Sequence, residues 1–359
     1  MDHTILIHTP LGRPPIGHSR RVRGRWVLIQ CVTGEVRERP NGESTADGHM
    51  RSLHRRNYCS ADSRDTLVRH AADLLLSHMA RRASLSPMPP PAKDALSPGL
   101  PPTLPDVGVG GRGALAALAP VALDGAAHLD HPGYLAHMDP AAADVACAAA
   151  LWQVATNQNL LHPDAAPAAR GLEQRVIEWL APYFGMHGGH LVPGSTVANL
   201  TALWAARELS QVTRIISSDR SHNSIAKAAH LLGLRHVVVP SDPQTHRCDF
   251  GRSRTRDALG DLSDAAVVLT AGTVATGAVD VLERPASAAW VHVDAAWSAP
   301  MRLSPALASV LDGIEVADSV GFSAHKWLYQ PKVLSKHAHP NPHPRPIRAP
   351  HNRRTRACA

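Results

Sequence analysis

The 359-residue sequence contains no run of about 18 apolar residues, so a membrane-spanning helix is not expected. Its first residues lack the basic segment and apolar stretch of a secretory signal. The five cysteines are scattered, without the spacing of a metal site or a disulfide framework: Cys31, Cys59, Cys147, Cys248 and Cys358. These absences favour a cytoplasmic protein that holds no metal ion.

Acidic residues are also missing from one end of the chain. Residues 331–359 contain 7 basic and no acidic side chains, and residues 1–59 contain 10 basic and 5 acidic ones. The body between them holds 20 basic and 25 acidic groups, although the whole chain carries a net charge of +7. A mildly acidic body is poorly suited to a phosphate backbone, so nucleic acid is not an expected partner.

Composition divides the chain into four segments. Residues 1–59 are rich in Arg, Gly and Pro without a regular period, which predicts a disordered basic segment. Residues 60–130 are expected to hold helices at 63–79 and 113–126, joined by a Pro-rich connector at 85–110. A large domain is expected over 131–332, followed by a disordered basic tail over 333–359.

Within the large domain, short β-branched runs alternate with helical patterns. Buried strands are predicted at 214–217, 235–239, 265–270, 290–293 and 319–322, and helices at 197–209 and 223–231. This alternation predicts an α/β fold with a mostly parallel, doubly wound sheet. Ligands of such sheets bind outside the carboxyl ends of the strands, so functional residues are expected there.

Two charged residues follow predicted strands. Lys326 lies in Ser-Ala-His-Lys-Trp. A lysine in a semi-enclosed site can act as a nucleophile toward an aldehyde, although a lysine at a strand end is more often a solvated charge. Asp294 closes the apolar run 290–293, where an acid is costly unless it meets a cation. A helix cap or a salt bridge is the alternative for this aspartate.

Three further motifs lie at strand ends or helix starts. The turn at 189–196 runs into the helix expected from 197, which is typical of an anion site, although Ser and Thr are also ordinary N-caps. His222 lies between a strand and a helix, where a capping or surface role is common. The Thr-Ala-Gly-Thr segment at 270–273 is otherwise a plain turn.

In chain order, the motifs G-S-T-x-A-N-L, S-H-x-S, T-A-G-T, H-V-D-A-A-W and S-A-H-K-W resemble those of the group II pyridoxal 5'-phosphate-dependent amino-acid decarboxylases. That family includes aromatic-amino-acid, glutamate and diaminobutyrate decarboxylases, and the likeness covers roughly residues 100–332. The resemblance implies a transferase-like fold (fold type I) with 131–332 as the cofactor-binding domain. It also implies a homodimer that converts an L-amino acid to its amine and CO2.

The resemblance also implies a role for each matching residue. Lys326 would form the internal aldimine, Asp294 would pair with the pyridine nitrogen and improve the ring as an electron sink, and His222 would stack on the ring. Contacts with the phosphate are implied for Ser195, Thr196, Ser323 and His325, contacts with the ring for Thr273 and Ala296, and proximity to the substrate for Tyr134 and His137.

The resemblance ends at about Lys332, whereas family members continue with a mobile loop and a small C-terminal domain. We therefore expect that domain to be missing through truncation or a frameshift, and the activity to be low. Two alternatives remain open. One is another fold-type-I enzyme, such as an aminotransferase or a lyase, and the other is an inactive remnant whose basic tails bind nucleic acid. The substrate's side chain is not predicted.

Overall fold

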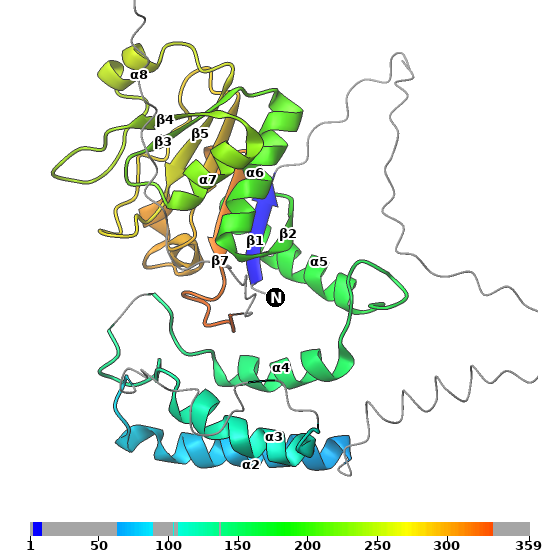
Figure 1. Ribbon diagram of the computed structural model, residues 1–359. Helices are drawn as coiled ribbons and strands as arrows, with labels where there is room; N and C mark the ends of the chain where they lie inside the picture. The colour runs from blue at the N-terminus through cyan, green and yellow to red at the C-terminus, as the bar shows by residue number, and fades with distance from the viewer. Residues whose placement is uncertain (1–2, 9–62, 89–102, 104–106, 136–137, 333–359) are drawn as a thin grey trace, which may run out of the picture. The chain divides into compact units, whose positions relative to one another are not determined.

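A computed structural model of the chain describes residues 3–8, 63–88, 103, 107–135 and 138–332 (Figure 1). These residues fall into two compact units: unit 1 within residues 1–9 and 144–359, and unit 2 within residues 10–143. The predicted tail at 333–359 lies outside the described residues. None of the helices in the described ranges is long and apolar enough to cross a membrane.

Unit 1 is built on a seven-stranded sheet with the order β2-β1-β7-β6-β5-β3-β4. Five strands form the parallel part of this sheet, namely β3 (Arg214–Ser218), β4 (Arg235–Val239), β5 (Ala265–Thr270), β6 (Trp290–Asp294) and β7 (Ser319–Ser323). The predicted α/β fold with a mostly parallel sheet is therefore confirmed, and all five predicted strands are present within one residue of their expected ends.

The expectation of disorder before residue 60 is wrong for residues 3–8. These residues form β1 (His3–His8), which lies inside the sheet and pairs antiparallel with both β7 and β2 (Gly188–Pro193). The Arg-, Gly- and Pro-rich composition of the whole segment hides its short run Thr-Ile-Leu-Ile. Such a continuous apolar run shows no alternation, which is common for strands inside a sheet.

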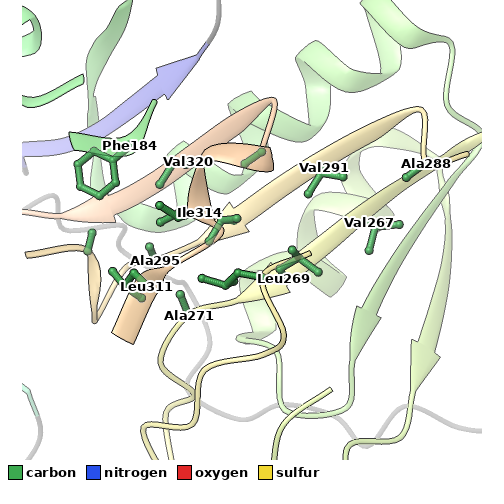
Figure 2. Packing of buried hydrophobic residues seen from close by; sticks show 14 of the residues in the cluster. Phe184, Val267, Leu269, Ala271, Ala288, Val291, Ala295, Leu311, Ile314 and Val320 are labelled. Atoms are coloured by element: carbon green, nitrogen blue, oxygen red, sulfur yellow. The ribbon is translucent and has the colours of Figure 1, made fainter. Parts of the chain in front are cut away.

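Alternate residues of each strand face opposite layers, as the pleat requires. On one face, α6 (Gly194–Ser210) and α7 (Asn223–Leu232) pack against the sheet through a core that includes Leu203, Ile225 and Val268. On the other face, β5, β6 and β7 contribute Leu269, Val291 and Val320 to a second core (Figure 2). Short 3-10 turns and α5 (Ala169–Leu180) cover this second core, in which Phe184 and Ile314 are buried.

Two further helices of unit 1 are α4 (Asp144–Thr156) and α8 (Ser253–Leu259). With α5 and β2, they are elements that the sequence did not predict. The helices predicted at 197–209 and 223–231 are confirmed, although α6 begins earlier, at Gly194.

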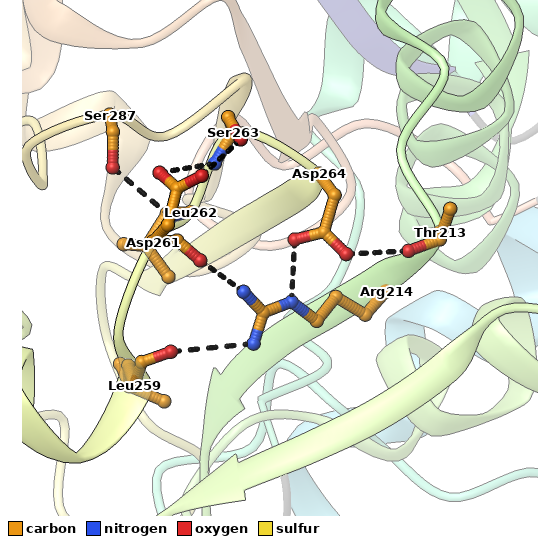
Figure 3. A network of polar contacts seen from close by, with 8 residues as sticks. All are labelled: Thr213, Arg214, Leu259, Asp261, Leu262, Ser263, Asp264 and Ser287. Atoms are coloured by element: carbon orange, nitrogen blue, oxygen red, sulfur yellow. Dashed lines mark hydrogen bonds and ion pairs between the residues drawn. The ribbon is translucent and has the colours of Figure 1, made fainter.

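A polar network ties together the amino-terminal ends of β3 and β5 (Figure 3). Arg214 donates from Nε to Asp264 Oδ1 at 2.8 Å and from its terminal nitrogens to the backbone carbonyls of Leu259 and Asp261. Thr213 Oγ1 donates to the second oxygen of Asp264 at 2.7 Å. Hydrogen bonds from Thr213 and Arg214, together with the charge of Arg214, hold the pKa of Asp264 below its usual range despite partial desolvation. The network therefore stabilises the sheet edge opposite the predicted site.

Unit 2 contains α2 (Arg64–Arg81) and α3 (Gly110–Ala119), which continues into a π-helical turn over Pro120–Asp124. Both predicted helices are thus confirmed, and most of the Pro-rich connector between them lies outside the described residues. The buried ring of His78 joins the two helical segments, because its Nδ1 lies 2.9 Å from Asp124 Oδ1.

Candidate functional site

The carboxyl ends of the central strands bring several predicted residues to one edge of the sheet. Thr270 of β5 is opposite Asp294 of β6, and Asp294 is opposite Gly321 of β7. β3 and β5 are neighbours, yet the chain leaves β3 toward β4 and leaves β5 toward β6. This reversal is a topological switch point, where doubly wound sheets bind their ligands. Ser221 Oγ lies 3.1 Å from Thr270 Oγ1, so the loop between β3 and α7 contacts the end of β5.

Asp294 is the last residue of β6, and only 3% of it is exposed. Its Oδ2 accepts a hydrogen bond of 2.9 Å from Asn199 Nδ2, and its Oδ1 accepts one of 3.1 Å from the backbone N–H of Ala296. Both donors are neutral. A buried carboxylate with neutral donors remains able to bind a cation, because burial makes an unpaired charge costly.

His222 is the N-cap of α7, and its ring is exposed. Nδ1 accepts from the backbone N–H of Ser224 at 3.2 Å and lies 2.9 Å from Ser224 Oγ. The capping role that is common at this position is therefore real. It also fixes the ring at the start of the helix, next to the loop that contacts β5.

Two residues to which the sequence reasoning assigned no role connect His222 to Asp294. The buried amide of Asn199 donates from Nδ2 to Ser224 Oγ at 2.9 Å and to Asp294 Oδ2 at 2.9 Å. Asn199 lies one helical turn after Ser195 on α6, and this spacing of four residues is the signal that could have identified it.

Buried His292 extends this network from β6. Its Nε2 lies 3.0 Å from Asn199 Oδ1, and its Nδ1 lies 2.9 Å from Ser319 Oγ. Burial lowers the pKa of His292 to about 4, although the charge of Asp294 acts in the opposite direction, so the ring is neutral at pH 7. His292 precedes Asp294 by two residues and therefore shares its face of the strand.

Ser195 and Thr196 lie inside the first turn of α6, rather than before the helix as predicted. Gly194 begins the helix with φ +77°, and Pro193 at the N-cap provides no side-chain hydrogen bond. The first backbone N–H groups of a helix have no partners within the helix, so this terminus suits an anion.

Thr273 and Ala296 follow the ends of β5 and β6. Thr273 is buried, and its Oγ1 accepts from the backbone N–H of Ala278 at 3.1 Å, whereas Ala296 is half-buried. Gly272, with φ +98°, makes this turn possible, and a Cβ at that position would lie 2.9 Å from the ring of Trp297.

Lys326 lies in the turn that follows β7 and is half-buried. The next residue, Trp327, packs edge-on against Trp297, with 5.1 Å between the ring centroids. The turn that carries Lys326 is therefore held against the loop that follows Asp294. Ser323 is completely buried at the end of β7, and its Oγ has no hydrogen-bond partner among the described residues.

The two predicted substrate residues lie outside the described part of unit 1. Tyr134 lies in unit 2, where its backbone N–H donates to His131 at 2.8 Å, and His137 lies outside the described residues. Their role stays a prediction. Within the ranges that the structure describes, no group of three or more His, Cys, Asp or Glu side chains could hold a metal ion.

The residues fit pyridoxal 5'-phosphate in three respects. A buried carboxylate suits a protonated ring nitrogen, a half-buried lysine suits an aldehyde, and a buried hydroxyl without a partner among the described residues, together with a helix N-terminus, suits a phosphate. The structure links Asp294 and His222 by hydrogen bonds. The other predicted residues of unit 1 share the same edge through the sheet register or through the start of α6.

Comparison with known proteins gives one consistent picture. Residues 117–333 match the family model described as the pyridoxal-dependent decarboxylase conserved domain. The chain is 33% identical over 246 residues to an L-2,4-diaminobutyrate decarboxylase of Rhizobium meliloti, covering 64% of this chain and 50% of the relative. It is 29% identical over 293 residues to an aromatic-L-amino-acid decarboxylase of Bacillus atrophaeus, covering 76% of this chain and 60% of the relative.

Solved structures show the same likeness. The structure of Oryza sativa TDC with PLP and tryptamine superposes with a TM-score of 0.66 at 25% identity. The match covers 76% of this chain and 62% of the other. The glutamate decarboxylase domain of a Vibrio parahaemolyticus protein superposes with a TM-score of 0.65 at 25% identity, covering 78% and 68%. The predicted fold is therefore that of pyridoxal-phosphate-dependent decarboxylases.

Proposed function

This chain belongs to the pyridoxal-dependent decarboxylase family, and from this premise we propose that it removes the α-carboxyl group of an L-amino acid as CO2 and releases the amine. Pyridoxal 5'-phosphate is the cofactor of this domain. When bound, it accepts the electrons that the departing carboxyl group leaves at Cα. The chain spans about half the length of the curated relatives it matches, so the activity is our proposal.

The buried carboxylate of Asp294 is the observation that carries this proposal. The two oxygens of Asp294 accept hydrogen bonds from Asn199 and from the backbone N–H of Ala296, and both of these donors are neutral. A protonated pyridine nitrogen would supply the opposite charge. Asp294 would thereby hold the proton on that nitrogen, and retaining this proton maintains the ring as an electron acceptor.

Lys326 would hold the cofactor through its aldehyde. Its position after β7 puts it at the same sheet edge as Asp294, and the Trp297–Trp327 contact keeps the two loops together. The amine of a lysine is the group that attacks an aldehyde. Ser323, the first turn of α6 with Ser195 and Thr196, and His325 would bind the phosphate.

His222 would stack on the face of the cofactor ring. Thr273 and Ala296 would make further contacts with the same ring. Nδ1 of His222 is engaged by Ser224, so Nε2 is the nitrogen that would hold or donate a proton at the site. Tyr134 and His137 are proposed to contact the substrate. The matched relatives are named for diaminobutyrate and aromatic amino acids, which makes these two classes the first substrates to examine.

We further propose a homodimer in a reducing compartment. α4 is apolar on all sides. Four of its exposed residues would be buried against a second copy of the chain: Val145, Leu151, Trp152 and Val154. Cys147 on the same helix is a free, exposed thiol, which suits the cytoplasm. Sedimentation analysis should give a dimer, and Trp152→Glu should shift it toward the monomer.

The activity is tested by incubating the full chain with pyridoxal 5'-phosphate and a panel of amino acids. We expect an amine and CO2 in equal amounts, and no product with Lys326→Arg, which retains the positive charge. A 2-oxo acid as the product would instead indicate an aminotransferase and contradict the proposal.

A further inference from the structure

We propose that Asn199 is a positioning residue: its hydrogen bond to Asp294 sets the orientation of its amide, and this orientation fixes both His222 and His292 with their proton on Nε2. The proposal deepens the proposed function, because it concerns residues of the same site. It can nevertheless be tested without any cofactor. The relevant atoms form one chain of hydrogen bonds, and the chemistry of its ends sets the direction of every bond.

The orientation of the Asn199 amide follows from its neighbours. The NH2 group faces Asp294 and donates to its Oδ2 at 2.9 Å, because the amide oxygen could not donate to that carboxyl oxygen. The second N–H of the same group then points to Ser224 Oγ, also at 2.9 Å. The amide oxygen is left facing His292 Nε2 at 3.0 Å, and this nitrogen must therefore carry a proton.

The branch through Ser224 sets the state of His222. Ser224 Oγ accepts from Asn199, so its own hydrogen is available to His222 Nδ1 at 2.9 Å. The backbone N–H of Ser224, which can only donate, is aimed at the same nitrogen at 3.2 Å. With two donors directed at it, Nδ1 has no proton. In the neutral ring the proton is then on Nε2, on an exposed side chain.

The hydrogen bonds on the other side of Asn199, which pass through His292, run in the same direction. Trp290 Nε1 is a donor only, and it donates to Ser319 Oγ at 2.9 Å. Ser319 can then donate to His292 Nδ1 at 2.9 Å. The opposite tautomer would donate from Nδ1 to the Ser319 carbonyl at 3.2 Å, but it would turn a bare Nε2 toward the Asn199 oxygen. Every bond from Trp290 to His222 therefore runs in one direction.

Burial makes this arrangement costly to break. Asn199, Ser224, His292 and Ser319 are each no more than 1% exposed, so water is not a ready substitute for a lost partner. Gly321 of β7 allows α6 to approach this closely, because a Cβ there would lie 3.3 Å from Asn199 Oδ1. The amide is thus packed between α6 and the strands that carry Asp294 and His292.

The test is the imidazole tautomer, measured by long-range proton–nitrogen NMR on the ¹⁵N-labelled, cofactor-free full chain. The His222 signal is assigned by its loss in His222→Gln. We expect the Nε2–H form in the parent. In Asn199→Asp the new carboxyl group would share a proton with Asp294, and its oxygen at the former NH2 position would accept the Ser224 hydroxyl hydrogen, which turns that hydrogen away from His222. The ratio of Nδ1–H to Nε2–H in His222 should then rise about tenfold, as expected for one lost hydrogen bond.

Two further comparisons separate this effect from added charge and from misfolding. Asn223→Asp adds the same charge next to His222 on an exposed residue and should leave the tautomer ratio unchanged. If Asn199→Asp does not fold, Ser224→Ala should raise the ratio in the same sense, and Ser224→Thr, which keeps the hydroxyl, should restore it. An Nδ1–H form in the parent, or equal ratios in Ser224→Ala and Ser224→Thr, would overturn the proposal. Neither result depends on whether the chain binds pyridoxal 5'-phosphate.

Discussion

At the scale of single residues, Asp294 combines burial, a defined set of neutral donors and a place at the end of a central strand. Its two oxygens accept from Asn199 and from the backbone of Ala296. These bonds orient the carboxyl group, and a cationic ligand at this position would meet a buried acidic side chain.

Replacement of Asp294 by Asn should weaken the binding of pyridoxal 5'-phosphate much more than replacement by Glu. The amide lacks the charge and also places an NH2 group against the N–H donors of Asn199 or Ala296. We expect the dissociation constant to rise about 100-fold or more in Asp294→Asn, equivalent to about 3 kcal/mol, measured by fluorescence titration. Equal affinity of Asp294→Asn and the parent would contradict the proposed charge pairing.

Asp280 is a second buried carboxylate with a different role. Its oxygens accept from the backbone N–H groups of Cys248 at 2.7 Å and Thr270 at 2.8 Å, so it ties two loops to the end of β5. Burial raises the pKa of Asp280 from 3.8 to about 6, although the two hydrogen bonds act in the opposite direction.

This raised pKa predicts a loss of stability as the pH increases. The folded chain binds the Asp280 proton more tightly than the unfolded chain does, so the free energy of unfolding should fall between about pH 4 and pH 6, the two pKa values. Above about pH 6 the ionisation of Asp280 should have lowered the free energy of unfolding by about 3 kcal/mol in total. Urea unfolding at pH 4 and pH 7 should show this fall in the parent and a correspondingly smaller one in Asp280→Asn. The same pH dependence in both proteins would show that Asp280 is not the group responsible.

At the scale of elements, the sheet depends on a strand that is distant in sequence from its neighbours. β1 separates β2 from β7 and forms hydrogen bonds with both. Without β1, each neighbour would have an unpaired edge at this point. β7 leads directly into the turn that carries Lys326, so the support that β1 gives to β7 extends to the candidate site.

Proline at position 5 should therefore destabilise unit 1. Ile5 pairs with Leu191 on one side and with Phe322 on the other, and proline removes the N–H that bonds to one of them. We expect Ile5→Pro to lower the free energy of unfolding by about 3 kcal/mol, as measured by urea denaturation. Ile5→Val retains the N–H and serves as the matched control. A proline variant as stable as the valine variant would show that β1 is not part of the sheet in solution.

Elements were predictable where their pattern was local and strong. β3, β5, β6 and β7 combine β-branched runs with polar residues at their ends, and all were found. β2 was not, because its sequence Gly-Gly-His-Leu-Val-Pro contains two glycines and a proline, and it is stabilised by pairing with β1 rather than by propensity. α4 was not predicted because its apolar residues surround the helix and show no amphipathic period.

At the scale of the whole molecule, the sequence predicted the sheet edge that carries the candidate site but not the contacts within it. Asp294, His222 and Lys326 lie at a strand end or a helix start, and the family resemblance implied their roles. Asn199 and His292 were overlooked because their importance depends on packing between α6 and β6, which no local pattern contains. Both residues lie within motifs that carry the family resemblance, so the missing information was tertiary.

We propose above all that the chain holds pyridoxal 5'-phosphate through Lys326. The most direct measurement is to incubate the full chain with the cofactor, reduce with borohydride, digest and locate the modified lysine by mass spectrometry. We predict a single modified peptide that contains Lys326 and no modification in Lys326→Arg. A label on Lys227 or Lys332 with Lys326 unmodified, or an equal level of labelling in the arginine variant, would contradict the account.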